Sequence, residues 1–140
     1  MAGEATLKLR THDPVDFTCA DGTGIEKGTL LKLTTPRTAS ATTGAGNEFL
    51  AGIAAREKIA SDGRTQIAVF RRGIFDMYCS GAITAGDQVC ACIGTTFPNY
   101  VASGSILTSG AAVLGTALES GAAGSVVEID VSIGMGRANR

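Results

Sequence analysis

The feature of this sequence that most constrains its fold is a strand-turn pattern that occurs twice, about sixty residues apart. Residues 25–33 read Ile-Glu-Lys-Gly-Thr-Leu-Leu-Lys-Leu, and residues 83–91 read Ile-Thr-Ala-Gly-Asp-Gln-Val-Cys-Ala. This spacing of isoleucine, glycine and aliphatic residue is typical of a tight turn that leads into a β-strand. A second pair of segments, 49–54 and 113–118, repeats in the same order. We therefore expect two related halves of one β structure, which favours a structural scaffold over an enzyme.

Apolar alternation and regularly spaced turn residues predict that the rest of the chain is also β structure. Residues 125–133 alternate most cleanly, and turn clusters recur at intervals of roughly 8–12 residues. We expect an all-β fold, a small β-barrel or a β-sandwich, of about eight or nine short strands with an internally duplicated strand-turn unit. Residues 48–60 also fit a helical stripe, but the repeat favours a strand over residues 49–54. Residues 66–70 and 73–79 are two strands or one long bent strand.

The sequence divides into three parts of different character. Residues 1–18 are expected to form an N-terminal arm, residues 19–133 a single β domain, and residues 134–140 a flexible C-terminal tail. Within the domain, residues 34–47 carry no aliphatic side chain larger than alanine. This segment is therefore expected to be a mobile surface loop.

Composition favours a small, self-associating protein without a nucleic-acid or membrane partner. The 140 residues include 19 Gly, 21 Ala and 16 Thr but no Trp, so the core has few large side chains and oligomerisation is expected. The net charge is −1 and the basic residues are dispersed, which is a poor match for nucleic acid. The sequence has neither a run of 18 apolar residues nor a signal-peptide pattern, so we expect synthesis in a cytoplasm and no membrane partner.

The four cysteines do not have the spacing of a metal site. Neither a CxxC pair nor a pair of histidines is present, so we expect no metal ligands. Cys90 and Cys92 lie two residues apart on an expected strand, where their Cα atoms are nearly 7 Å apart, at the limit of what a disulfide spans. We expect Cys19, Cys79, Cys90 and Cys92 to be free thiols packed as small hydrophobic groups. A chain-linking or inter-subunit disulfide is the alternative.

The sequence contains no recognisable catalytic or cofactor-binding constellation. His12 is the only histidine, and no Gly-x-Ser-x-Gly nucleophile motif exists to serve it as a base. The glycines of residues 22–28 resemble a dinucleotide-binding fingerprint, but they are spaced one residue too far and no helix is expected to follow them. We therefore expect a protein that is not an enzyme and that binds no cofactor.

The order of these segments resembles the capsid decoration proteins of tailed bacteriophages, which are also called cement or head-stabilising proteins. The resemblance covers roughly residues 25–133 and rests on the ordered segments Gly52-Ile53-Ala54, Gly73-Ile74-Phe75-Asp76-Met77, Ile83-Thr84-Ala85-Gly86-Asp87-Gln88-Val89 and Leu114-Gly115-Thr116-Ala117-Leu118, followed by an alternating strand. It implies a small β-barrel or β-sandwich that oligomerises, more as a homotrimer than as a dimer. It also implies binding to the outer face of the major capsid protein lattice, without catalytic residues.

The resemblance leads us to expect a non-enzymatic structural protein, made in the host cytoplasm and located on the capsid exterior of a virion. Such a protein stabilises the assembled shell by binding to it. Leu7 and Leu9 alternate with polar residues, so the N-terminal arm has an apolar face that could lie on the capsid. The expected capsid contacts are Leu7, Leu9, His12, Pro14 and Phe17. The alternative is a β-module that binds a carbohydrate or a host receptor at the virion or cell surface.

Overall fold

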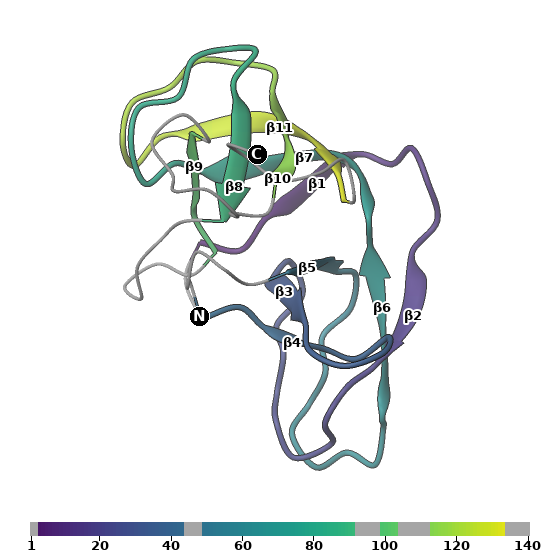
Figure 1. The fold of residues 1–140 in the computed structure, drawn as a ribbon. Coiled ribbons are helices and arrows are strands. Elements are labelled where there is room, and N and C mark those ends of the chain that lie inside the picture. Colours follow the sequence, from purple (N-terminus) through teal and green to yellow (C-terminus); the bar gives the residue numbers. More distant parts are fainter. Residues whose placement is uncertain (1–2, 44–48, 92–98, 104–112, 134–140) are drawn as a thin grey trace.

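The structure is a computed structural model, and it describes residues 3–43, 49–91, 99–103 and 113–133. These residues form eleven β-strands in two antiparallel sheets, and none of them is helical. The all-β prediction is confirmed, and so is the strand predicted over residues 49–54. Figure 1 shows the two sheets as an upper and a lower lobe. No described residue belongs to a helix that is long and apolar enough to cross a membrane.

The two sheets have the same strand order. The first half of the molecule contains β2 (Val15–Thr18), β3 (Leu30–Leu33), β4 (Ala39–Ala41), β5 (Leu50–Ala54) and β6 (Gln66–Phe70), hydrogen-bonded in the order β2-β6-β5-β3-β4. The second half contains β7 (Arg72–Tyr78), β8 (Gln88–Ala91), β9 (Val101–Ser103), β10 (Val113–Ala117) and β11 (Val126–Ser132), in the order β7-β11-β10-β8-β9. Only β1 (Thr6–Leu9), which pairs with β7, has no counterpart. The duplication therefore extends to the whole topology.

The turns between strands repeat the same hydrogen bonds in each half. In the first half, Ile25 and Lys58 each donate their N–H to the carbonyl of the other, and in the second half Ile83 and Gly121 do the same. At the turn before β3, the N–H of Gly28 donates to Ala54 at 2.9 Å. The equivalent bond before β8, from Gly86 to Ala117, is 2.8 Å long. The sequence pattern of residues 25–33 and 83–91 therefore corresponds to one repeated turn.

The central strands β5 and β10 also correspond to each other. Aligning residues 49–54 with 113–118 in the sequence matches Gly52 with Thr116, but the structure is shifted from this alignment by one residue. Gly52 pairs with Leu31, and Gly115 pairs with Val89, so the two glycines are equivalent. A β-carbon on Gly52 would collide with the Phe70 carbonyl oxygen, and one on Gly115 with the Asp130 carbonyl oxygen. Each position requires glycine because a neighbouring strand lies against it.

Each half encloses its own apolar interior. The first interior contains Phe17, Cys19, Ile25, Leu31, Ala39, Ala51, Ala54, Ile67 and Val69. The second interior is continuous with the contact between the halves, because the outer face of the first sheet packs against it. In that contact the rings of Phe70 and Phe75 meet edge to face, with centroids 5.7 Å apart. The arrangement is sandwich-like, and neither sheet is a closed barrel, although the two edge strands of each half approach each other at one isolated bridge.

The chain passes from the first half to the second without a linker. Strand β6 ends at Phe70 and β7 begins at Arg72, so the two strands run on with only Arg71 between them. Figure 1 shows this path on the right of the molecule, where it connects the lower lobe to the upper one. Residues 66–79 therefore form two strands, one in each sheet, which is the first of the two alternatives expected from the sequence.

Three expectations differ from the structure. The described residues contain eleven strands rather than eight or nine, because three-residue strands such as β4 and β9 are too short to show a period. The expected loop at residues 34–47 contains β4, whose Ala39 is buried opposite Leu33. Residues 6–9 and 15–18 pair with β7 and β6, so the N-terminal segment is part of the sheets rather than a separate arm. The C-terminal tail expected at residues 134–140 lies outside the described residues.

Candidate docking surfaces

The segment that joins β1 to β2 crosses from the second sheet to the first, and the expected contact residues lie in it and in the two strands that flank it. Leu9 is 57% exposed, whereas Leu7 is partly buried against the core. The two side chains do not share a face as expected, because the register shifts between them: Leu7 pairs with Phe75, and Leu9 pairs with Ile74. In a regular strand residues two apart share a face, and the extra residue of a β-bulge places them on opposite faces. Of these two leucines, Leu9 is therefore the one that this strand presents to solvent.

His12 lies at the exposed crossing between β1 and β2. Its Nδ1 is 3.0 Å from the hydroxyl oxygen of Thr11. Beside it, Arg10 donates to Asp13 at 2.9 Å across an exposed turn. Pro14 is half-buried where β2 begins. The crossing therefore offers a polar, solvent-facing surface around His12, of which Pro14 forms one side.

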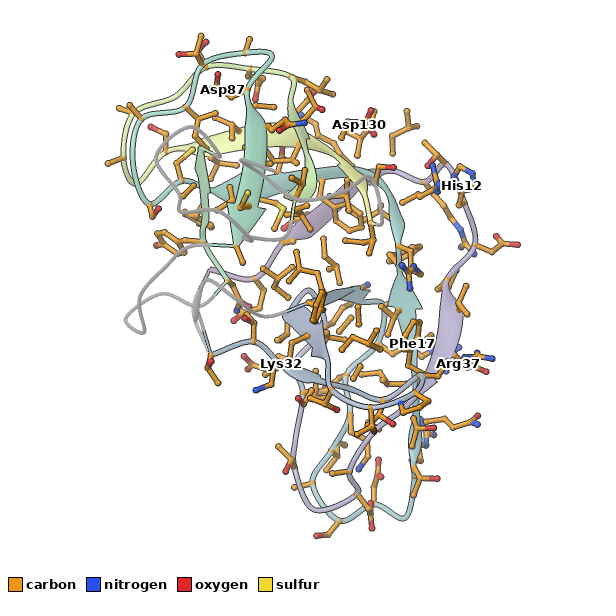
Figure 2. The ribbon with its side chains drawn as sticks, in the orientation of Figure 1. His12, Phe17, Lys32, Arg37, Asp87 and Asp130 are labelled. Carbon is orange, nitrogen blue, oxygen red and sulfur yellow. The ribbon has the colours of Figure 1, made fainter. Side chains whose placement is uncertain are left out.

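Phe17 is only 4% exposed, so it is not available as a direct contact. The guanidinium carbons of Arg37 and Arg71 each lie 5.8 Å from the centre of its ring, a distance at which cations are attracted to aromatic faces. Figure 2 shows Phe17 and Arg37 side by side on the first half. Val15, on the same strand, is 42% exposed. We call the open end of the first interior, formed by Val15, Phe17, Arg37 and Arg71, the first mouth.

The backbone holds Arg37 in an unusual conformation. Its φ is +48°, a left-handed value that side chains other than glycine and asparagine rarely adopt. The Arg37 carbonyl accepts the N–H of Thr18 at 2.7 Å, and its guanidinium donates to the carbonyl of Asp16. Local strain is retained when the surrounding structure enforces it. Hydrogen bonds to both the backbone and the side chain of Arg37 therefore hold its guanidinium over Phe17.

The equivalent end of the second half is buried inside the molecule. The register makes Met77 the counterpart of Phe17 and Val131 the counterpart of Arg71, and both are buried. Asn99, also fully buried there, accepts the N–H of Leu30 from the first half at 2.9 Å. We call this end the second mouth. It is covered by the first half, whereas Val15 and Arg37 at the first mouth are exposed to solvent.

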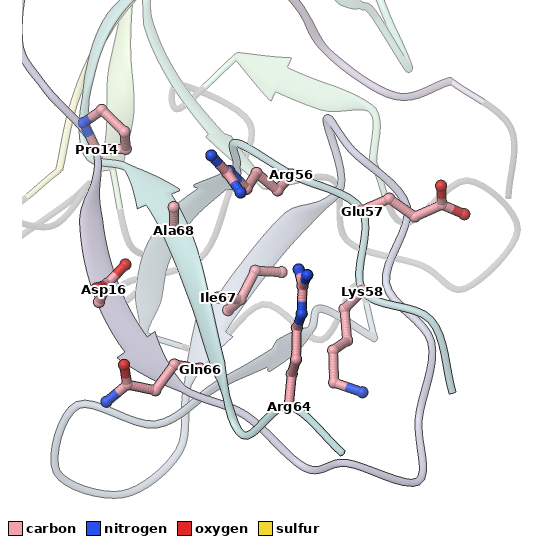
Figure 3. A pocket seen from close by; sticks show the side chains of 9 residues that line it. All are labelled: Pro14, Asp16, Arg56, Glu57, Lys58, Arg64, Gln66, Ile67 and Ala68. Carbon is pink, nitrogen blue, oxygen red and sulfur yellow. The ribbon is translucent and has the colours of Figure 1, made fainter. Parts of the chain in front are cut away.

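A shallow groove of about 270 Å³ lies on the other side of β2 and β6 (Figure 3). Its lining is mostly polar and carries both charges: Asp16 and Gln66 project from the two strands, and Arg56, Glu57 and Arg64 from the loops beside them. No apolar pocket of the kind that encloses a small ligand is formed by these residues.

Lys58 is a buried charged residue at the tip of the first half, and sequence patterns alone did not predict its burial. Its side chain is 1% exposed, and its Nζ donates to the carbonyl oxygens of Asp21 and Ile59 and lies 3.0 and 2.8 Å from the carboxylates of Asp21 and Asp62. Burial opposes its charge, but the hydrogen bonds to Asp62 and Asp21 outweigh burial, and the pKa of Lys58 is raised. The same bond holds the pKa of Asp62 at about 2. Lys58 therefore ties together the loops at the tip.

The outer face of the second sheet is acidic. Lys8 from β1 lies 2.7 Å from Glu128 and 3.8 Å from Asp76, and its hydrogen bond to Glu128 raises the pKa of Lys8. Asp130, on the same face of β11, is exposed and has no ion-pair partner among the described residues. Figure 2 shows it on the upper lobe, away from Arg37. Arg72 of β7 is exposed on this face as well, so the face carries both charges, with more carboxylates than basic groups.

The described cysteines are free, buried thiols at Cys19, Cys79 and Cys90, while Cys92 lies outside the described residues. Burial raises the pKa of all three described thiols, and that of Cys90 to about 11. Within the part of the chain that the structure describes, no three His, Cys, Asp or Glu side chains gather as metal ligands would. These thiols act as small core residues.

Comparison with known proteins finds a likeness in fold alone. No protein-family model and no curated protein matches the sequence. Among solved structures, the chain is similar to the N base of the head fiber protein gp8.5 in bacteriophage phi29. The two share 17% sequence identity with a TM-score of 0.55, and the match covers 85% of this chain and 94% of the head fiber base. The duplicated all-β fold described above is thus one that a bacteriophage head fiber base also adopts.

Proposed function

We propose that this chain is a non-enzymatic structural protein of a bacteriophage head, which binds the outer surface of the assembled capsid and stabilises it. The observation that carries the proposal is the fold likeness to the phi29 head fiber base, which extends over 94% of that base. The ordered segments that resemble capsid decoration proteins support it independently, since they were read from the sequence without the fold. The partner that this proposal implies is the major capsid protein.

The mechanism is binding linkage. A protein that binds the assembled shell but not its separated subunits stabilises the shell by its binding free energy. No bond is made or broken, so the requirement is a complementary surface rather than a catalytic group. A virion-exterior location follows for a protein that acts in this way.

The crossing from β1 to β2 is the part of the expected contact surface that solvent reaches. Leu9 and His12 are exposed there, and Pro14 shapes its far side. Leu7 and Phe17 support this surface from below, because they are partly or fully buried. We assign the capsid contact to Leu9 and His12.

Co-sedimentation with empty expanded heads of the phage that encodes the chain tests this assignment. We expect Leu9→Asp to weaken binding by about tenfold or more, because a charge replaces an apolar contact. Ile59→Asp is the matched control, since Ile59 is 62% exposed at the far tip of the first half. Equal binding by wild type and Leu9→Asp would remove the crossing as the contact. Failure of the wild type to bind would refute the decoration function itself.

Point substitutions are required because the segment cannot be deleted cleanly. Removal of residues 2–13 would take away β1, expose the edge of β7 and uncover the core beside Leu7. A truncated chain that failed to bind could therefore simply have unfolded. Circular dichroism of each point variant establishes that the fold is intact before binding is compared.

A further inference from the structure

The first mouth presents two guanidinium groups that have no carboxylate partner. Those of Arg37 and Arg71 lie over the ring of Phe17, and neither forms an ion pair with any residue that the structure describes. Asp16 is next to Phe17 in the sequence, but its side chain lines the groove on the other side of β2 (Figure 3). Two like charges therefore share one aromatic ring without a counter-ion.

Another arginine of this molecule shows how such a site is completed. The guanidinium carbon of Arg10 lies 5.8 Å from the centre of the Phe70 ring, and the same guanidinium donates to the carboxylate of Asp13 at 2.9 Å. A guanidinium over an aromatic ring can still donate its N–H groups to a carboxylate. The first mouth has the same arrangement of arginine on a ring twice, but without the carboxylates.

Arg37 is held in place before any ligand binds. Its left-handed backbone, with a φ of +48°, accepts the N–H of Thr18, and its guanidinium donates to the carbonyl of Asp16. A cation that is already positioned loses little conformational freedom when it binds an anion. Strained backbone conformations are also concentrated at ligand-binding sites. Arg37 therefore suits the recognition of a ligand oxyanion.

The outer edge of β2 is poorly suited to pairing with an added strand. The N–H of Thr18 and the carbonyl of Asp16 are both engaged by Arg37, and Pro14 has no N–H to donate. A partner at this mouth is therefore recognised through its side chains. Val15, which is 42% exposed, adds an apolar contact to the two guanidiniums.

These groups define the chemistry of the ligand. A guanidinium binds a carboxylate through two parallel hydrogen bonds, and an apolar side chain is the matching contact for Val15. A nucleic-acid backbone fits less well, since it requires several basic residues and this chain has a net charge of −1. Peptide carboxylates beside an apolar residue match both kinds of group.

We propose that the first mouth binds an acidic peptide segment of another protein. Two carboxylates of the segment contact Arg37 and Arg71, and an apolar side chain beside them packs on Val15. The site uses neither Leu9 nor His12, to which the capsid contact is assigned. It therefore goes beyond the proposed function and does not depend on it.

A nuclear magnetic resonance titration with a short peptide tests the proposal. The probe is the acetylated and amidated tetrapeptide Glu-Glu-Val-Glu, and the matched control is Gln-Gln-Val-Gln. The Glu peptide should shift the side-chain Nε–H signals of Arg37 and Arg71 with a Kd on the order of 1 mM, as expected for two ion pairs near the surface. The Gln peptide should leave these signals unchanged. Added salt should weaken binding of the Glu peptide.

Single substitutions identify the charges that bind the peptide. Arg37→Gln and Arg71→Gln should each weaken binding by about fivefold or more, because each removes a charge-assisted pair of hydrogen bonds. Val15→Ser should weaken it by only about twofold, since a small apolar contact is lost. Arg56→Gln and Arg64→Gln remove the same charge from the groove of Figure 3, and both should bind like the wild type. Circular dichroism establishes the fold of each variant, and Arg71→Gln decides the result if Arg37→Gln does not fold.

Several outcomes would each overturn the proposal. The wild type could fail to bind the Glu peptide at about 10 mM, or bind the Gln peptide equally well. Arg71→Gln could bind the Glu peptide as well as the wild type does, or Arg56→Gln and Arg64→Gln could weaken binding as much as Arg71→Gln. Tighter binding of a single-stranded DNA tetranucleotide than of the Glu peptide would show that the mouth recognises phosphate, and the proposal would be wrong.

Discussion

The two halves of this molecule share a backbone plan and differ in the chemistry of their tips. In the first half the tip is held by the buried Lys58 and the two carboxylates around it. In the second half the register places Gly121 at that position, packed against Val127 and Ser125. The backbone hydrogen bonds of both tips are nevertheless the same. Main-chain pairing thus defines the fold, while the side chains at equivalent positions have diverged.

The interiors of the halves also differ in the size of their side chains. Ala51 of the first interior corresponds to Leu114 of the second, and Phe17 corresponds to Met77. The central-strand position thus changes from small in the first half to large in the second, while the edge strand carries a large side chain in both halves. The two interiors therefore contain different side-chain volumes, and because protein interiors are closely packed, their backbones must accommodate the difference.

The largest effect is expected where the halves are most alike. Gly52→Ala and Gly115→Ala each drive a methyl group into a neighbouring carbonyl oxygen, so each should destabilise the protein by on the order of 4 kcal/mol or prevent folding. Gly81→Ala is the control, because nothing lies within 4 Å of its added carbon. Denaturant unfolding measures all three. If only one of the first two variants were harmed, the structural equivalence of the glycines would be disproved.

The next effect separates the two interiors. Leu114→Ala leaves a cavity in the second half and should cost about 2–5 kcal/mol of unfolding free energy. Ala51→Leu adds the corresponding volume to the first half, where Phe17 already fills the space, and should cost about 1–3 kcal/mol. Urea unfolding of both variants checks that Leu114→Ala lowers the unfolding free energy more than Ala51→Leu does. A stabilised Ala51→Leu protein would show that the first interior has room for the larger side chain that the second contains.

A smaller effect distinguishes the tips. Lys58→Met leaves two carboxylates without their partner and should lower the melting temperature by several degrees, with faster amide exchange confined to the tip of the first half. The contribution of Asp62 is fully present above its ordinary pKa of 3.8 and is lost as the pH falls through about 2. This acid dependence should be weaker in Lys58→Met. The control is Lys27→Met, at an exposed lysine, whose acid dependence should match that of the wild type.

The smallest effect concerns the thiols, which behave alike in both halves. In a Cys92→Ser chain, Cys19, Cys79 and Cys90 should not react with a thiol reagent at neutral pH while the protein is folded. Their raised pKa values leave little thiolate, and that of Cys90 is about 11. Three thiols should then react after unfolding in denaturant. Rapid reaction of the folded protein would show that one of these sites opens.

The repeated turns could be predicted from the sequence because glycine marks them. Gly28 and Gly86 have φ values of +88° and +95°, so the signal in the sequence reflects a backbone requirement. The sequence comparison of 49–54 with 113–118 missed the equivalence of Gly52 and Gly115 by one residue. Strands β5 and β10 each contain a bulge beside the glycine, and sequence spacing does not reveal a bulge. Leu9 was placed on the wrong face for the same reason. Bulges shift a register without changing composition.

The charged sites could not be predicted, because they depend on contacts between distant residues. Arg37 and Arg71 meet only at the ring of Phe17, and Lys58 finds Asp21 only when two loops close on each other. Asn99 reaches Leu30 across 69 positions of sequence. A single sequence indicates that such residues are polar, but the partner of each is set by the topology.

The apolar outer face of the first half has a consequence for how the protein is made. Leu30, Leu50, Ile53 and Phe70 leave the ribosome before the second mouth that covers them exists. A first half that folds during synthesis therefore exposes this apolar face to solvent until the last strand, β11, has been made. A chain arrested after β6 should aggregate, or bind a chaperone, through this face. Because the first half is made before the second, we expect the protein to be most prone to aggregation during translation, before the second half has covered this face.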